Sequence, residues 1–67
     1  MELIDTPNPN AKKVITDIKE NQLSRDLYEV KGVSNVFFGP GFITITKEEN
    51  TLWESINEDI INIFDRL

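Results

Sequence analysis

The chain has 67 residues, a formal net charge of −5, and neither cysteine nor histidine. This length corresponds to one domain with a small hydrophobic core, and we expect residues 1–67 to form it. The missing thiols and imidazoles exclude disulfides, metal sites built on these ligands, and cysteine or histidine catalysis. Because phosphate contacts need clustered lysine and arginine, an acidic chain is also a poor nucleic-acid binder, and we expect no nucleic-acid partner.

The negative charge is concentrated near the end of the sequence. Residues 1–47 carry as many acidic as basic side chains, whereas Arg66 is the only basic residue in 48–67. The acidic residues there are Glu48, Glu49, Glu54, Glu58, Asp59 and Asp65. They indicate either a patch that steers a basic partner or the solvated face of a helix, and we favour the solvated face.

The N-terminal residues predict a short strand over 2–5 at the edge of a sheet, with Leu3 and Ile4 as its apolar residues. They contain neither the basic region nor the long apolar region of a signal peptide. No apolar run approaches the roughly 20 residues that span a membrane. We therefore expect a cytoplasmic chain without membrane association.

Thr6-Pro7-Asn8-Pro9-Asn10 interrupts regular structure, because each proline biases the preceding residue away from helix. We interpret this segment as a rigid connection to a second strand, Lys12–Ile18. Alternation along that strand places Val14, Thr16 and Ile18 on one side and Lys13, Ile15 and Asp17 on the other.

A helix is predicted over Gln22–Val30, with Asn21 as its N-cap and Gly32 just beyond its end. Apolar residues recur at helical spacing at Leu23, Leu27 and Val30.

The stretch Gly32–Lys47 predicts a β-hairpin. Val33–Phe38 and Phe42–Thr46 are rich in β-branched and aromatic residues, and Gly39-Pro40-Gly41 between them suits a type II turn. In the first strand Val36 and Phe38 share one face and Phe37 lies opposite. In the second, Ile43 and Ile45 share one face, with Phe42, Thr44 and Thr46 on the other.

The last segment is an amphipathic helix. Thr51-x-x-Glu54 matches a capping box, with Asn50 as an alternative cap. The apolar stripe consists of Trp53, Ile56, Ile60, Ile63, Phe64 and Leu67. We expect Trp53 to seat the helix on the sheet and rank a ligand-stacking role second.

The predicted order is strand, strand, helix, strand, strand, helix. A chain this short buries two amphipathic helices most economically on one sheet face. We therefore expect an α+β fold of two layers, a four-stranded, mainly antiparallel sheet with both helices on one face; the strand order stays undetermined.

The opposite sheet face would then be open to water. It would carry Phe37, Phe42, Thr44 and Thr46, with Ile15 or Lys13. Exposed apolar patches often bind partners, so these four residues form a candidate partner-binding site. The alternative is that the Thr6–Asn10 loop or the chain ends cover Phe37 or Phe42.

The sequence offers no catalytic site. The neighbouring carboxylates Glu48-Glu49 and Glu58-Asp59 diverge on a helix or turn and match no calcium loop, and there is no glycine-rich phosphate cradle. We predict no catalytic residue, no cofactor and no metal ligand, and therefore no enzyme.

Three motifs carry a family resemblance. They are T-P-N-P-N-A at 6–11, L-x-E-V-K-G-V-S-N-V-F-F-G-P-G-F-I-T-I-T-K at 27–47, and W-E at 53–54. Together they make nearly the whole chain resemble the N-terminal domain of the Nfu (NifU-like) iron–sulfur cluster scaffold proteins.

The resemblance implies a role in iron–sulfur cluster maturation. In that family a separate C-terminal domain holds the cluster through a Cys-x-x-Cys pair, and the N-terminal domain helps recognise client or partner proteins. Since this chain has no cysteine, we expect it not to be a cluster ligand itself.

Two functional hypotheses follow. The first is an interaction module, monomeric or weakly oligomeric, that docks onto iron–sulfur scaffold or client proteins. The second is a small structural or regulatory protein unrelated to clusters, which acts by self-association through a sheet edge or by binding of its acidic helix to a basic partner.

Overall fold

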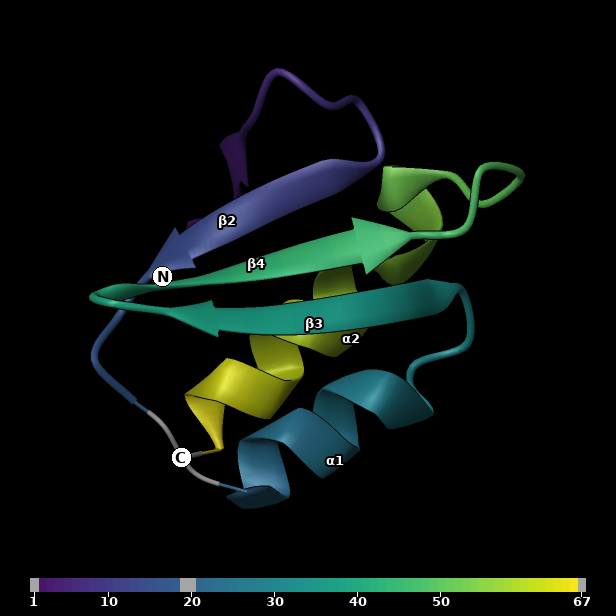
Figure 1. Cartoon of the computed structure of the whole chain (residues 1–67). Coiled ribbons are helices and arrows are strands. Elements are labelled where there is room, and N and C mark those ends of the chain that lie inside the picture. Colours follow the sequence, from purple (N-terminus) through teal and green to yellow (C-terminus); the bar gives the residue numbers. More distant parts are fainter. Residues whose placement is uncertain (1, 19–20, 67) are drawn as a thin grey trace.

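The computed structural model of the chain describes residues 2–18 and 21–66 (Figure 1). Its strands are β1 (Ile4–Asp5), β2 (Ala11–Ile15), β3 (Val33–Gly39) and β4 (Phe42–Lys47). Its helices are α1 (Asn21–Glu29) and α2 (Trp53–Asp65). The predicted element order is confirmed, while Leu67 of the predicted stripe lies outside the described residues.

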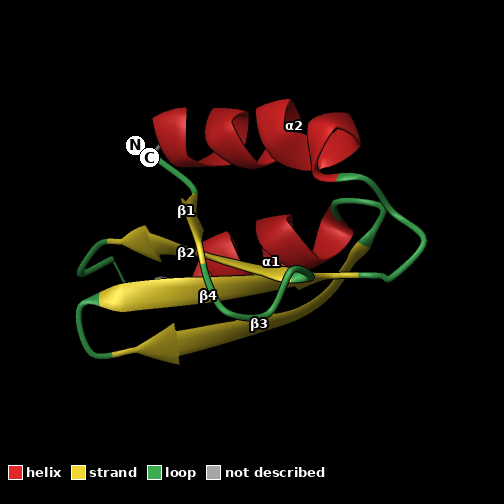
Figure 2. Ribbon diagram, turned by 90° about the horizontal axis from the view of Figure 1, so that it is seen from above, coloured by secondary structure: helices red, strands yellow, loops and turns green. Residues whose placement is uncertain are grey.

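The four strands form one antiparallel sheet in the order β1-β2-β4-β3. Both helices pack on the same side of it, so that Figure 2 shows a helical layer above a sheet layer. The predicted α+β fold of two layers is confirmed, and the strand order that the sequence left open is now defined.

The first two strands are shorter than predicted. β1 covers only the end of the expected 2–5 segment, and β2 ends at Ile15 rather than Ile18. The reason lies in the neighbouring strand. The amide of Thr16 still donates to the carbonyl of Gly41 at 3.1 Å, but β4 begins at Phe42, so residues beyond Thr16 have no strand to pair with.

The hairpin confirms the predicted turn. Gly39 and Phe42 face each other across a two-residue loop, and Gly41 has φ +76°. A type II turn requires positive φ at this position, which glycine adopts without strain. The register shifts between Val33 and Asn35 because Ser34 is an extra residue in β3, forming a bulge.

The hydrophobic core lies between the sheet and the helices. Its buried residues are Val14, Leu23, Leu27, Val30, Val36, Ile43, Ile45, Ile56, Ile60, Ile63 and Phe64. All of them belong to the apolar faces that the periodicity of the sequence predicts, and Phe38 and Trp53 pack against them half-buried.

The predicted capping box of α2 is wrong. The N-cap is Leu52, in extended conformation, and no side chain caps the helix. The Thr51 side chain lies instead against Gly32: a Cβ added to this glycine, at φ +108°, would be 2.7 Å from Thr51 Cγ2. The Thr51 side chain thus packs against the connection between α1 and β3 instead of capping α2.

Candidate protein-docking surface

The sheet surface turned away from the helices is here called the open face. Strand register places on it Ile4, Ala11, Lys13, Ile15, Asn35, Phe37, Phe42, Thr44 and Thr46. The central cross-strand row runs from Ile4 through Lys13 and Thr44 to Phe37. The predicted members Phe37, Phe42, Thr44 and Thr46 therefore do share one surface, together with both Ile15 and Lys13.

The apolar side chains at one end of the open face are in contact with water. Ile15 is 64% exposed and Phe37 is 56% exposed. The ring centroids of Phe37 and Phe42 lie 6.2 Å apart at an interplanar angle of 44°, within the range of a favourable aromatic pair. Ile15 is the cross-strand partner of Phe42, so these three side chains form one continuous apolar patch.

Phe42 is half-buried because its ring lies on Gly39. A Cβ added to Gly39 would be 2.2 Å from the ring atom Cζ of Phe42, closer than any real contact. Gly39 therefore serves as a seat for the ring, as glycines opposite aromatic residues do in other sheets. This seat fixes Phe42 beside Phe37, and the sequence gives no sign of it beyond the glycine itself.

Thr44 and Thr46 continue the open face in half-buried positions. Thr44 pairs with Lys13 on one side and Phe37 on the other, and Thr46 pairs with Ala11. Lys13 is the one ionisable side chain among the open-face residues defined above. The surface thus combines the apolar patch at one end with threonine hydroxyls, the exposed Asn35 and a single cation.

The Thr6–Asn10 loop does not cover this patch. Its Pro9 carbonyl accepts a hydrogen bond from Trp53 Nε1 at 3.0 Å, and the Asn10 carbonyl accepts one from the Lys47 amide at 2.8 Å. The loop therefore lies against α2 and the end of β4. The alternative that the loop or the chain ends cover Phe37 is wrong, because Phe37 is 56% exposed, and the half-buried Phe42 lies on Gly39 rather than under the loop.

Side-chain hydrogen bonds hold the same loop, which we predicted to be a rigid connection. The Thr6 hydroxyl accepts a bond from the Asn8 amide and lies 2.9 Å from the Ala11 carbonyl oxygen. Asn8 Oδ1 accepts a bond from the Asn10 amide at 2.9 Å. These bonds give the threonine and asparagine of the T-P-N-P-N motif a structural role.

Trp53 anchors α2 on the core, as expected, and also on this loop. Besides the bond to Pro9, its ring lies under the ammonium of Lys12, which is 5.3 Å from the ring centroid and 3.4 Å from the Asp5 carboxylate. Lys12 of the same chain thus occupies one face of the Trp53 ring, so a ligand could not stack on that face without displacing it.

Lys47 is buried, although lysine is usually an exposed residue. Its Nζ donates to Asn10 Oδ1 at 2.9 Å and to the Glu48 carbonyl at 3.3 Å, and the residue is only 9% exposed. The strand alternation would have placed it on the helix side, since it follows Thr46 of the open face. Its role is to join the end of β4 to the loop.

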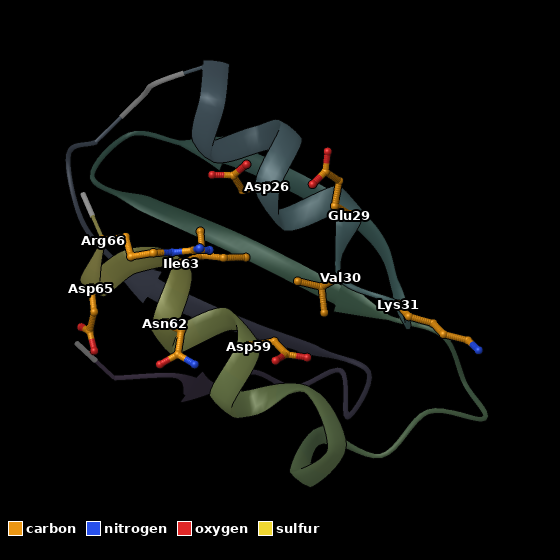
Figure 3. A pocket seen from close by; sticks show the side chains of 9 residues that line it. All are labelled: Asp26, Glu29, Val30, Lys31, Asp59, Asn62, Ile63, Asp65 and Arg66. Carbon is orange, nitrogen blue, oxygen red and sulfur yellow. The ribbon is translucent and has the colours of Figure 1, made fainter.

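A second surface feature is a shallow groove of about 640 Å³ between α1 and α2. Figure 3 shows that Asp26 and Glu29 of its lining belong to α1, whereas Asp59, Asn62 and Asp65 belong to α2. Val30 and Ile63 supply its apolar lining, and Arg66 and Lys31 are the basic residues of the groove.

The acidic residues Glu54, Glu58 and Asp65 of α2 are exposed, which agrees with a solvated acidic helix face.

Residues 2–18 and 21–66 contain no group of three acidic side chains arranged to hold a metal ion. Within the same ranges, neither helix has the length and apolar content that crossing a membrane requires.

The fold and the surface define a small α+β domain of two layers with an exposed, mainly apolar sheet face. The family model described as "Scaffold protein Nfu/NifU N terminal" matches residues 16–67. The chain therefore belongs to this family, as the resemblance of its motifs indicated.

Two curated relatives share this region. The chain is 40% identical over 73 residues to the human "NFU1 iron-sulfur cluster scaffold homolog, mitochondrial", covering 84% of this chain and 29% of that protein. The protein of the same name from Drosophila grimshawi is 33% identical over 76 residues, covering 88% of this chain and 26% of the relative. The chain thus spans less than a third of the length of these relatives.

Solved structures confirm the fold. The crystal structure of the Staphylococcus aureus protein SAV1430 matches with a TM-score of 0.85 at 23% identity, covering 96% of this chain and 95% of the other. A solution NMR structure of a Staphylococcus epidermidis protein matches with a TM-score of 0.68 at 26% identity, covering 98% and 94%.

Proposed function

We propose that this chain is a non-catalytic protein-interaction module in iron–sulfur cluster assembly or delivery, which docks onto scaffold or client proteins through the open face. The family match supports the association with cluster assembly. The single observation that carries the docking site is the uncovered patch of Ile15, Phe37 and Phe42. Thr44 and Thr46 would supply hydroxyls at its side.

The chain would hold no cluster itself, because it lacks the thiolates that bind iron–sulfur clusters. We also propose that residues 1–67 act as one domain, that it is monomeric or weakly oligomeric, and that it works in the cytoplasm. The curated relatives are mitochondrial by name, so fractionation of the native cell tests the last point.

The test is an anaerobic capture with three purified baits: the wild type, Ile15→Thr/Phe37→Thr, and Leu52→Ser. The first variant removes the apolar patch while keeping β-branched residues in the strands. The second is a matched control, because Leu52 is 61% exposed but lies at the start of α2, away from the open face. All three baits must first give the same circular dichroism spectrum.

We expect the wild type and Leu52→Ser to retain iron–sulfur scaffold or client proteins, identified by mass spectrometry, and Ile15→Thr/Phe37→Thr to lose them. Equal capture by all three baits would place the docking site elsewhere. If no bait retains an iron–sulfur protein, the association with cluster assembly fails for this chain.

The acidic groove supports a second candidate function, the binding of a basic partner unrelated to clusters. Four carboxylates, those of Asp26, Glu29, Asp59 and Asp65, border it. Such binding would weaken steeply as salt is raised, whereas docking on the apolar open face would not. Repeating the capture at low and high salt distinguishes the two.

A further inference from the structure

The sheet has one long free edge among the described residues. β3 is the outermost strand next to β4 and has seven residues, whereas β1 at the opposite edge has only two. An edge strand presents unpaired N–H and C=O groups that can pair with another chain, and proteins protect such edges. We therefore ask which residues protect the outer edge of β3 from pairing with another chain.

The backbone groups that point outward from β3 follow from the ladder. In an antiparallel pair, alternate residues direct both their N–H and their C=O toward the neighbouring strand. The Val36 N–H bonds outside the ladder, so Val36 and, two residues later, Phe38 direct their groups away from β4. The Phe38 groups bond to no side chain among the described residues.

Tyr28 of α1 occupies the middle of this edge. Its hydroxyl accepts a hydrogen bond from the Val36 N–H at 3.0 Å and lies 3.4 Å from the Val36 carbonyl oxygen. It donates to Asn35 Oδ1 at 3.0 Å. One exposed side chain, 47% accessible to water, thus pairs with the Val36 N–H and lies beside the Val36 carbonyl, the two backbone groups that a pairing strand would use.

We propose that the outer edge of β3 is a latent strand-pairing surface for a second copy of this chain, and that the Tyr28 hydroxyl keeps it closed. Removal of this hydroxyl frees the Val36 N–H and C=O beside those of Phe38. Two copies then join β3 to β3 in an antiparallel pair.

A second copy is the occupant that fits this edge best. An antiparallel edge pair is related by a two-fold axis perpendicular to the sheet, so the same groups serve on both sides. This axis also keeps the two open faces on the same side. The exposed Phe37, adjacent to Val36 in β3, then lies near its own copy, and the two apolar patches become continuous.

The experiment compares the wild type with Tyr28→Phe, which removes only the hydroxyl, and with Tyr28→Ala, which also removes the ring that shields the edge. Arg25→Ala is the matched control, because Arg25 is exposed on the same helix and has no hydrogen bond to β3. Sedimentation equilibrium measures self-association, and NMR hydrogen exchange follows the amides of Val36 and Phe38.

We expect the wild type and Arg25→Ala to stay monomeric at concentrations where at least one Tyr28 variant dimerises, with self-association at least about tenfold tighter than in the wild type. In the dimer the Phe38 amide should become protected from exchange, more strongly at higher protein concentration. This protection assigns the contact to the β3 edge.

Three results would overturn the proposal. Both Tyr28 variants could remain monomeric with rapid exchange at Val36 and Phe38, which would show that the hydroxyl guards nothing. A variant could dimerise without protection of Phe38, which would place the contact on another surface. A wild type that dimerises through β3 as tightly as the variants would show that Tyr28 does not close the edge.

Discussion

At the scale of single residues, two positions have roles that depend on a neighbour far along the chain or across a turn. Gly39 has no side chain and therefore leaves room for the Phe42 ring. The Asn10 side chain accepts a hydrogen bond from the buried ammonium of Lys47. Neither role is visible in composition or periodicity. Each of these two contacts can be tested by a single substitution.

We predict that Gly39→Ala destabilises the fold by about 1–3 kcal/mol, because the new methyl group overlaps the Phe42 ring and displaces it. Urea denaturation measures the loss, and the Phe37 ring resonances report the movement. In Gly39→Ala/Phe42→Leu the clash is relieved, so the two changes should not add. Additive effects would mean that Gly39 is needed for another reason.

We predict that Asn10→Ala costs about 1–3 kcal/mol, because it leaves the buried Lys47 ammonium with one acceptor fewer. Lys47→Met keeps the apolar stem and removes the charge, so its cost should be smaller. In the Lys47→Met background Asn10→Ala should cost little. Urea denaturation of the four proteins measures this coupling, and a coupling near zero would contradict the contact.

At the scale of secondary structure, the start of α2 lacks a side-chain cap. Its N-cap residue, Leu52, has φ −95° and ψ 136°, which suits a capping residue, but a leucine side chain accepts no hydrogen bond. The first turn also contains the acidic Glu54, which the helix dipole favours. The helix is held mainly by its buried stripe.

We predict that Leu52→Asp stabilises the chain by about 1 kcal/mol, because its carboxylate would accept an N–H of the first turn. For a domain of this size the melting temperature should rise by roughly 4–8 °C. Leu52→Ala is the control that removes leucine without adding an acceptor. Thermal melts in which the aspartate and alanine variants behave alike would show that no cap forms.

At the scale of the whole molecule, the two faces of the sheet differ in how deeply their side chains are buried. The helix side contains the core, including Ile45 and Ile60, both fully buried. The open face has Ile15 and Phe37 more than half exposed. Ile15 and Phe37 therefore contribute little burial to the fold, so these two positions can vary with little loss of stability.

We predict that Ile15→Thr/Phe37→Thr changes the free energy of unfolding by less than about 1 kcal/mol, because exposed substitutions usually change it by no more than about 0.5 each. Ile60→Ala should cost about 2–5 kcal/mol and leave little of the cooperative transition. Urea denaturation compares them. A large loss in the open-face variant would mean that this patch belongs to the core.

The sequence by itself determined the element types, the type II turn and the side of each strand that faces the helices, because these depend on local backbone preference and on periods of two or 3.6 residues. It also brought Phe37, Phe42, Thr44 and Thr46 to one face, since alternation separates the two sides of each strand from Val36 onward and the more apolar sides face the helices. The family resemblance came from the same local motifs.

Only the tertiary structure decided the strand order, the ends of β1 and β2, the N-cap of α2 and the edge contact of Tyr28. Each depends on a partner distant in sequence: β2 ends where β4 offers no pairing, Thr51 turns to Gly32, and Tyr28 reaches Val36. Local patterns contain no information about which of several competing partners a side chain meets, and packing makes that choice.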